Sequence, residues 1–228
     1  MAKKRVTRKQ LLKEPDEFIT FSNRMIRLGV AYKQHLMIAV GVFCAAVLVY
    51  VGMQYVSARS RAKAFNLLEN AVARYDRELA QSGPAKALAD VQGDFELILN
   101  KYGSNAGGRL ARLTFAQYHF AAGGAERAIE LYNAALVDFE GDPLYRSLVL
   151  SGLGYAHSLK GDSPTAISFF EQVVSGTVAG LKSDALFNLG LLYARMGQYD
   201  KSKESFQRIK EEFPESFYAD MAGEKAKL

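Results

Sequence analysis

Tryptophan is absent from this chain of 228 residues, which also holds one cysteine and three histidines. The single cysteine, Cys44, excludes an intrachain disulfide and a cysteine-based zinc cluster. The histidines stand alone, without the additional ligand residues that a metal site needs. The sequence therefore predicts no metal and no cofactor. Apolar residues make up 49% of the chain, enough for a sizeable core.

Charge is absent from residues 36–56 and unevenly spread elsewhere. Residues 1–35 hold nine Lys or Arg against three acidic residues, whereas residues 57–228 hold 20 basic and 21 acidic residues. The overall charge of +5 therefore belongs to the N-terminal leader. A nucleic-acid-binding domain carries its positive charge on the folded face, so no nucleic-acid partner is expected.

Leu36–Met53 is a run of 18 residues without a charged or strongly polar group. As a helix it spans about 27 Å, close to the thickness of the hydrocarbon core of a bilayer. Two alternatives are a buried core helix and a cleaved signal peptide, for which Val56-Ser57-Ala58 offers small residues. The run is apolar on all sides and follows a long leader. We interpret residues 36–56 as a retained transmembrane helix.

The basic leader predicts the orientation, because short segments rich in Lys and Arg stay in the cytoplasm. The interpretation is a single-pass protein of the bacterial inner membrane, with the N-terminus cytoplasmic and the remaining chain periplasmic. Arg59, Arg61 and Lys63 follow the apolar run, so the reversed topology stays open as an alternative.

Three segments of the C-terminal half align with one another at intervals of 36 and 38 residues. "LFNLGLLYARMGQYDKSKESF" (186–206) aligns with 150–170 and then with 112–132. In each, a small residue (Ala116, Gly154, Gly190) precedes a glycine seven residues later, and an aromatic residue follows. A helix interior gains nothing from two glycines, but two helices joined by a turn use both, one for close approach and one to end the first helix.

This Leu-Gly, Gly, Ala, Phe, Pro pattern resembles the tetratricopeptide repeat. The resemblance implies an all-α fold: a transmembrane helix followed by a solenoid of helical hairpins. The predicted organisation is a basic cytoplasmic leader (1–35), a transmembrane helix (36–56), a degenerate first hairpin (57–108), three repeats (109–214) and a capping helix (215–228). The tryptophan of the repeat is missing; Arg112, Leu150 and Leu186 occupy its place.

No catalytic residue is predicted, so the chain is not expected to be an enzyme. "GDSP" (161–164) contains a Gly-Asp-Ser sequence, but the alignment places it at a turn where Asp162 or Ser163 caps a helix. "GSNAGG" (103–108) lacks the lysine of a phosphate-binding loop and is interpreted as a connector. His119 and His157 fall at a core-facing position of the repeat and are interpreted as packing residues.

The first helices of such repeats line a concave surface. The repeat pattern implies that this face carries an apolar groove for a hydrophobic peptide or helix; the alternative is that the same side chains pack against neighbouring helices. The residues assigned to the candidate groove are Leu113, Gln117, Phe120, Tyr155, Phe187, Leu191 and Arg195, with Ser151 and Ser158 at equivalent positions.

The layout as a whole resembles the ancillary subunit of the bacterial SecYEG translocon. That resemblance implies a chaperone-like protein-interaction module, with translocon subunits, periplasmic chaperones or secreted clients as partners. The alternative is a structural scaffold for another envelope complex that serves division, secretion or polysaccharide export. Either interpretation is compatible with a homo-oligomer.

Overall fold

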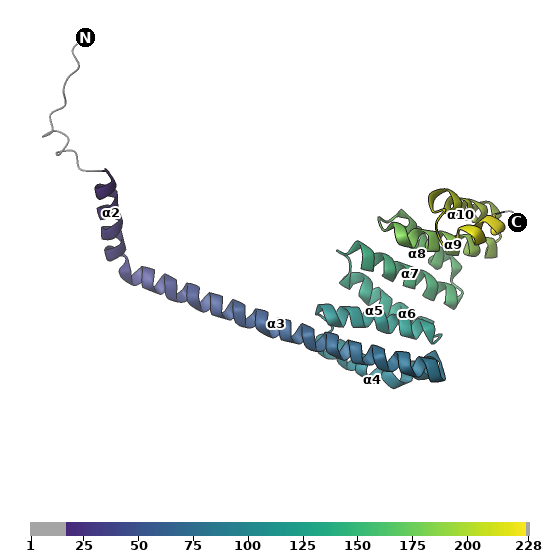
Figure 1. Ribbon diagram of the computed structural model, residues 1–228, viewed down its shortest axis with the longest axis horizontal. Helices are drawn as coiled ribbons and strands as arrows, with labels where there is room; N and C mark the ends of the chain where they lie inside the picture. Colours follow the sequence, from purple (N-terminus) through teal and green to yellow (C-terminus); the bar gives the residue numbers. More distant parts are fainter. Residues whose placement is uncertain (1–16, 227–228) are drawn as a thin grey trace, which may run out of the picture. The chain divides into compact units, whose positions relative to one another are not determined.

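The computed structural model describes residues 17–226, and these form helices joined by short turns (Figure 1). The chain divides into two compact units, residues 1–58 and 59–228. The expectation of an all-α array of helical hairpins is confirmed in the second unit. Residues 1–16 of the basic leader lie outside the described residues.

The first unit contains α2 (Glu17–Ala31) and the beginning of α3 (Lys33–Ser82). Among the described residues, α3 is the one helix long and apolar enough to cross a membrane, and its most apolar 18-residue window has a mean hydropathy of 2.5. None of that window is buried, whereas a core helix would be. A signal sequence near the N-terminus would meet the same criteria of length and composition.

α3 continues without a break past residue 56, where the sequence predicted a boundary between two elements. The physical reason is its composition: residues 53–82 contain no glycine and no proline, and many are good helix formers. The helix ends where Gly83 adopts φ +82° and Pro84 begins the next helix.

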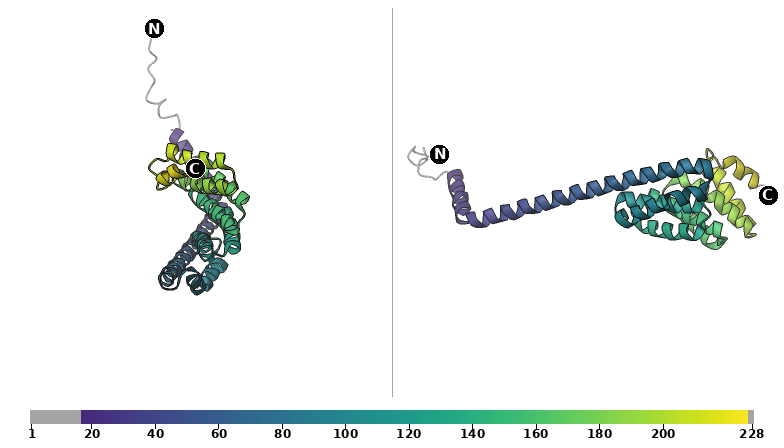
Figure 2. Two further views of the ribbon diagram at one scale, coloured as in Figure 1. Left: turned by 90° about the vertical axis from the view of Figure 1, so that its right-hand side faces the viewer. Right: turned by 90° about the horizontal axis from the view of Figure 1, so that it is seen from below.

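The second unit begins at Arg59 within α3 and continues as pairs of antiparallel helices (Figures 1 and 2). From α4 onward, each helix packs against the next one along the chain, and the first helices of successive repeats also touch. These elements are α4 (Pro84–Tyr102), α5 (Ala106–Ala121), α6 (Ala125–Asp138), α7 (Pro143–Lys160), α8 (Ser163–Ser175), α9 (Ala179–Arg195), α10 (Tyr199–Glu212) and α11 (Ala219–Lys225).

Each repeat turns at a glycine with a left-handed backbone, as the alignment predicted. Gly161 has φ +85° and Gly197 has φ +73°, a conformation that side chains with a Cβ avoid. The following helix in the second repeat is capped by Asp162, whose carboxylate accepts a hydrogen bond from the Thr165 amide. The Gly-Asp-Ser sequence is therefore a turn and a helix cap.

The first glycine of each pair, inside the first helix, permits close packing in two repeats. A Cβ added to Gly190 would lie 2.6 Å from the ring of Phe206, and one added to Gly154 would lie 2.8 Å from the ring of Phe170. The Ser202 hydroxyl, buried on α10, donates a hydrogen bond to the Gly190 carbonyl at 2.8 Å. Helices α9 and α10 are thus held at a distance that only glycine allows at this point.

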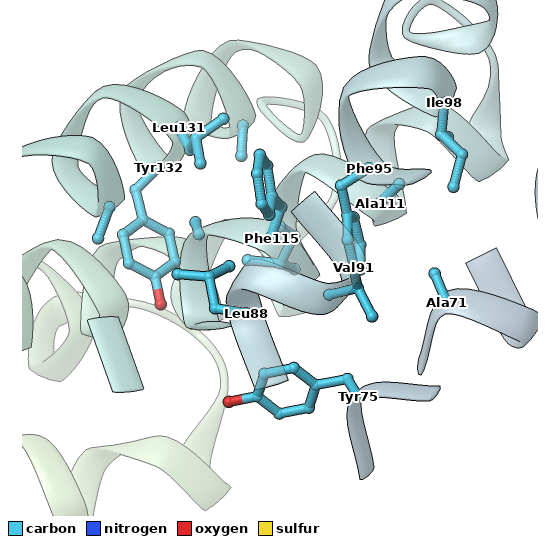
Figure 3. Close-up of a cluster of buried hydrophobic side chains, with 14 of the residues drawn as sticks. Ala71, Tyr75, Leu88, Val91, Phe95, Ile98, Ala111, Phe115, Leu131 and Tyr132 are labelled. Carbon is cyan, nitrogen blue, oxygen red and sulfur yellow. The ribbon is translucent and has the colours of Figure 1, made fainter. Parts of the chain in front are cut away.

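The core of the second unit starts where α3 meets α4 and α5 (Figure 3). Phe95 and Phe115 stack with ring centroids 5.0 Å apart, and Tyr75 stacks on Tyr118. Arg74 joins α3 to α4 at the surface through Asp90 and Asp94. Arg112, in the place of the missing tryptophan, pairs with Asp138 at the end of α6.

The buried face of α3 combines two large side chains, Leu68 and Tyr75, with two alanines. Phe65 and Leu79 are 42% and 39% exposed, whereas Ala64 and Ala71 are buried. Gly107 explains the difference, because a Cβ there would lie 2.7 Å from the Cβ of Ala64. Small residues face the neighbouring backbone, and the larger Phe65 is turned outward.

Candidate functional site

The first helices of the three repeats, α5, α7 and α9, carry all seven residues assigned to the candidate groove. The structure separates them into three groups. Leu113 is buried, Gln117 and Arg195 are exposed, and the other four are partly buried. The four partly buried residues are Phe120, Tyr155, Phe187 and Leu191.

The assignment of Leu113 to the groove is corrected by the structure, because Leu113 belongs to the hydrophobic core and is 3% exposed. A side chain that makes its contacts within the chain offers no area to a ligand. Ser151, at the equivalent position of the second repeat, is also buried. Leu113 and Ser151 therefore pack against neighbouring helices, which was the alternative to a groove.

Tyr155 connects the first two repeats. Its ring lies 5.9 Å from that of Phe120 on α5, and it meets the ring of Phe170 edge-on at 5.2 Å. The Tyr155 hydroxyl donates a hydrogen bond to the Asp184 carboxylate on α9 at 2.5 Å and accepts one from the Asn188 amide. Tyr155, which the sequence assigned to the groove, is thus part of an internal polar network.

Asp184 is the centre of that network, which we call the Asp184 cluster: Asp184, Tyr155, Asn188 and Tyr218. Tyr218, in the segment before α11, donates its hydroxyl proton to the other carboxylate oxygen of Asp184 at 2.7 Å. Burial and the Asp184 hydrogen bond raise the pKa of Tyr155 well above its ordinary value. The Asp184 hydrogen bond is also the main cause that raises the pKa of Tyr218 to about 12. Both hydroxyls are therefore neutral donors at neutral pH.

Phe187 is covered by the C-terminal segment. Its ring stacks on that of Tyr218 with centroids 4.8 Å apart and an interplanar angle of 28°, and it meets the ring of Phe206 edge-on. The segment that includes α11 therefore occupies the surface of the third repeat that the repeat pattern assigned to a ligand. Its helical part is Ala219–Lys225, shorter than the predicted span of 215–228.

Leu191 lines a hollow of about 390 Å³, together with residues of α10 and Lys225 of α11. Gln117 and Arg195 are the two candidate residues whose side chains are mainly exposed to solvent. The accessible part of the face is therefore mixed in character: an amide, a guanidinium group and the exposed edges of Phe120 and Leu191.

A larger hollow, of about 510 Å³, lies among α8, α9 and α10 and was missed by the sequence reasoning. Tyr193 stands in its wall, donates a hydrogen bond to Glu171 at 2.6 Å, and has the Lys201 ammonium 5.3 Å from its ring centre. The repeat alignment contains the signal: Ser205 stands where the second repeat has Phe169 and the first has Leu131. A small residue in the place of a large one leaves the space open.

The two histidines of the repeats pack against aromatic rings. His119 meets the Phe115 ring edge-on, and His157 lies over Phe169 with its Nδ1 atom 3.2 Å from Asp162. Among residues 17–226, no group of three or more His, Cys, Asp or Glu side chains is placed to hold a metal ion. The side chains on the first helices of the repeats therefore offer apolar and polar contacts to another molecule.

The comparisons with known proteins agree with this geometry. The family model described as "Tetratricopeptide repeat" matches residues 184–216, which cover most of α9, all of α10 and the turn after it. This part of the chain is a tetratricopeptide repeat. No curated protein matches.

Solved structures share the fold of this tetratricopeptide-repeat protein at low sequence identity. A tetratricopeptide repeat protein from Parabacteroides merdae ATCC 43184 is 15% identical with a TM-score of 0.56, over 71% of this chain and 59% of that one. Two structures of MamA are 20% and 19% identical, with TM-scores of 0.50 and 0.51. The matches span 67% and 71% of this chain and 90% and 84% of the MamA chains. These likenesses concern the fold.

A protein-interaction scaffold is the general role that this tetratricopeptide-repeat fold supports, because stacked hairpins present long surfaces to other proteins. Solenoids of this kind work through binding, and the polar groups of the Asp184 cluster are already paired with one another.

Proposed function

We propose that this tetratricopeptide-repeat protein is a membrane-anchored protein-interaction module at the outer face of the bacterial inner membrane. The observation that carries the proposal is the apolar window of α3, of which no residue is buried. Water is an unfavourable surrounding for so much apolar surface, whereas a bilayer satisfies both its length and its polarity. The basic leader supports a cytoplasmic N-terminus, with the repeats in the periplasm.

The proposed partner is a polypeptide segment, either an extended peptide or a helix. Support comes from the accessible side chains of the first repeat helices, where Gln117 and Arg195 are exposed and Phe120 and Leu191 are partly buried. Such a mixed surface suits an amphipathic segment. Together with the layout of leader, anchor and repeats, this favours an ancillary or chaperone-like subunit of the protein translocation machinery.

A structural scaffold for another envelope complex is the second candidate. The observation that favours it is the hollow beside Tyr193, because it opens among α8, α9 and α10, away from the Asp184 cluster. A fixed partner that inserts a side chain there would leave the exposed side chains of Gln117 and Arg195 free.

The anchor is tested first, in native membranes. A protein held by a transmembrane helix stays in the membrane pellet after extraction at alkaline pH and is released by detergent. A reporter enzyme that works only in the periplasm should be active when it is fused after Leu228. One that works only in the cytoplasm should be inactive there. Release at alkaline pH, or a mature chain that begins near Ser57, would exclude the retained anchor.

The two partner classes are separated by photo-crosslinking residues placed at Arg195, Glu204 and Asn133. Arg195 represents the accessible part of the first helices, Glu204 lines the hollow beside Tyr193, and Asn133 is an exposed control on α6. Translocon subunits or many secreted chains captured at Arg195 alone support the chaperone-like role. One fixed complex captured at Glu204, with no clients at Arg195, would replace it with the scaffold.

A further inference from the structure

α2 has two unlike faces, a feature separate from both the repeats and the apolar run of α3. At about 100° per residue, five of its apolar side chains fall within an arc of about 200°. Asn23, Arg24 and Arg27 occupy the opposite side. The apolar residues are all 49–71% exposed: Phe21, Met25, Ile26, Leu28 and Val30.

Within the described residues, this apolar face of α2 has no cover. Burial of large apolar side chains is favourable, so a helix with such a face gains from contact with an apolar phase. The cover could be a bilayer, a second copy of the chain or another protein. The charges near α2 and its short connection to α3 distinguish among these three covers.

Glu17 is the first residue of α2, and from Phe18 onward the helix carries charges of one sign only. Residues 18–68 contain no Asp or Glu, whereas Arg24, Arg27 and Lys33 precede the apolar run of α3 and three more basic residues follow it. A second copy of the same segment would bring like charges together. An anionic surface complements them.

The chain also brings α2 to the membrane. α2 ends at Ala31, one turn residue (Tyr32) separates it from α3, and the apolar run begins at Leu36. The Tyr32 amide donates a hydrogen bond to the Leu28 carbonyl, so little chain is free between the two helices. If α3 crosses a bilayer, α2 begins within a few residues of its surface.

We propose that α2 lies in the interface of an anionic bilayer. Its apolar face enters the boundary between headgroups and acyl chains, and Arg24 and Arg27 face the lipid phosphates. This inference rests on the proposed anchoring by α3. It adds a second contact with the membrane, specific for anionic lipid.

The test uses the full chain with Cys44→Ser, reconstituted in vesicles of phosphatidylcholine and phosphatidylglycerol. Single cysteines labelled with an environment-sensitive fluorophore replace Met25 on the apolar face, Asn23 on the polar face and Val47 in the apolar run. The Met25 label should be several-fold less accessible to aqueous iodide than the Asn23 label and should be quenched by spin-labelled lipid. The Val47 label should be buried in lipid throughout.

Each other outcome overturns a defined part of the argument. Equal iodide access at positions 25 and 23, with position 47 buried in lipid, would sink the inference and leave the anchor intact. Iodide access at position 47 would sink the anchor and the inference with it. A label at position 25 that neither quencher reaches would show that protein covers α2.

The preference for anionic lipid has its own matched control. Arg24→Gln with Arg27→Gln should raise iodide access at position 25 several-fold, as should the removal of phosphatidylglycerol. Lys3→Gln with Lys4→Gln removes the same charge outside α2 and should leave access unchanged. Equal effects of the two pairs would show a general charge effect and overturn the role of the two arginines.

Discussion

At the scale of single residues, Gly190 and Phe206 set the distance between α9 and α10. We expect Gly190→Ala to destabilise the fold by about 1–3 kcal/mol, because the added methyl group overlaps the Phe206 ring. This loss outweighs the gain of about 1 kcal/mol in helix propensity. Urea unfolding followed by circular dichroism measures the difference.

Gly93→Ala provides the matched control for that substitution. Gly93 lies inside α4, and a Cβ there would meet no atom within 4 Å. The same change should therefore stabilise the fold by about 0.5–1 kcal/mol. If the two variants shift stability in the same direction, the contact between Gly190 and Phe206 does not limit the packing of these helices.

His119 makes the first repeat sensitive to acid. Burial, and then the charge of Arg127, lower the pKa of His119 below its ordinary 6.5, against opposing effects of Glu96 and Glu130. The folded state thus prefers the neutral ring. The preference contributes to the free energy of unfolding above pH 6.5, and this contribution is lost as the pH falls below 6.5.

His119→Gln should flatten the dependence of unfolding free energy on pH between about 7.5 and 5. Equal slopes for the wild type and His119→Gln would contradict the assignment. Chemical denaturation at a series of pH values gives the slopes.

At the scale of elements, the C-terminal segment is held to α9 by Tyr218. Tyr218→Phe keeps the ring stacked on Phe187 but removes the hydroxyl that donates to Asp184. The expected loss is about 0.5–1.5 kcal/mol at neutral pH. Hydrogen exchange in α11 should also become faster, because α11 directly follows this contact.

The same variant tests the pKa of Tyr218, which the Asp184 hydrogen bond raises to about 12. A raised folded-state pKa contributes stability that is present below the ordinary value of 10.0 and is lost as the pH rises through about 12. The stability difference between wild type and Tyr218→Phe should therefore shrink across that window. A constant difference would contradict it.

The helical hairpins of the repeats could be predicted from the sequence because glycine and aromatic residues mark them at a fixed interval. Gly161 and Gly197 end first helices, and Phe170 and Phe206 fill the space against Gly154 and Gly190. Alanine gives no such signal: Leu68 and Tyr75 indicate the buried face of α3, but the burial of Ala64 and Ala71 in place of Phe65 and Leu79 could not be predicted.

The candidate site was harder to predict, because the repeat pattern specifies a face but not its occupant. Phe187 lies on the expected helix, yet Tyr218 covers it, and Leu113 belongs to the core. Tyr218 follows Asp184 by 34 residues, so the contact lies beyond the last glycine that marks a repeat in the sequence.

At the scale of the whole molecule, the described core belongs to the second unit. Its two clusters of buried side chains lie between Leu68 and Ala222. We expect residues 59–228, expressed alone, to be soluble and to unfold cooperatively, because the apolar run has been removed and every core residue retained. Thermal denaturation of this fragment and of the detergent-solubilised full chain should give midpoints within a few degrees.

A fragment that starts at Ala85 is the informative control. It lacks the α3 side chains Leu68 and Tyr75, which pack on α4 and α5, and should lose helical signal in the first hairpin. If residues 59–228 failed to fold while the full chain melted cooperatively, the apolar run would contribute to the stability of the repeats.

The packing of each helix from α4 onward against the next one along the chain also sets an order of assembly. Contacts between sequence neighbours close short loops, so a hairpin can fold while the residues after it are still being synthesised. The core is then built in the direction of synthesis. At any moment the growing chain exposes only its most recent hairpin, and the C-terminal segment with Tyr218 closes the array last.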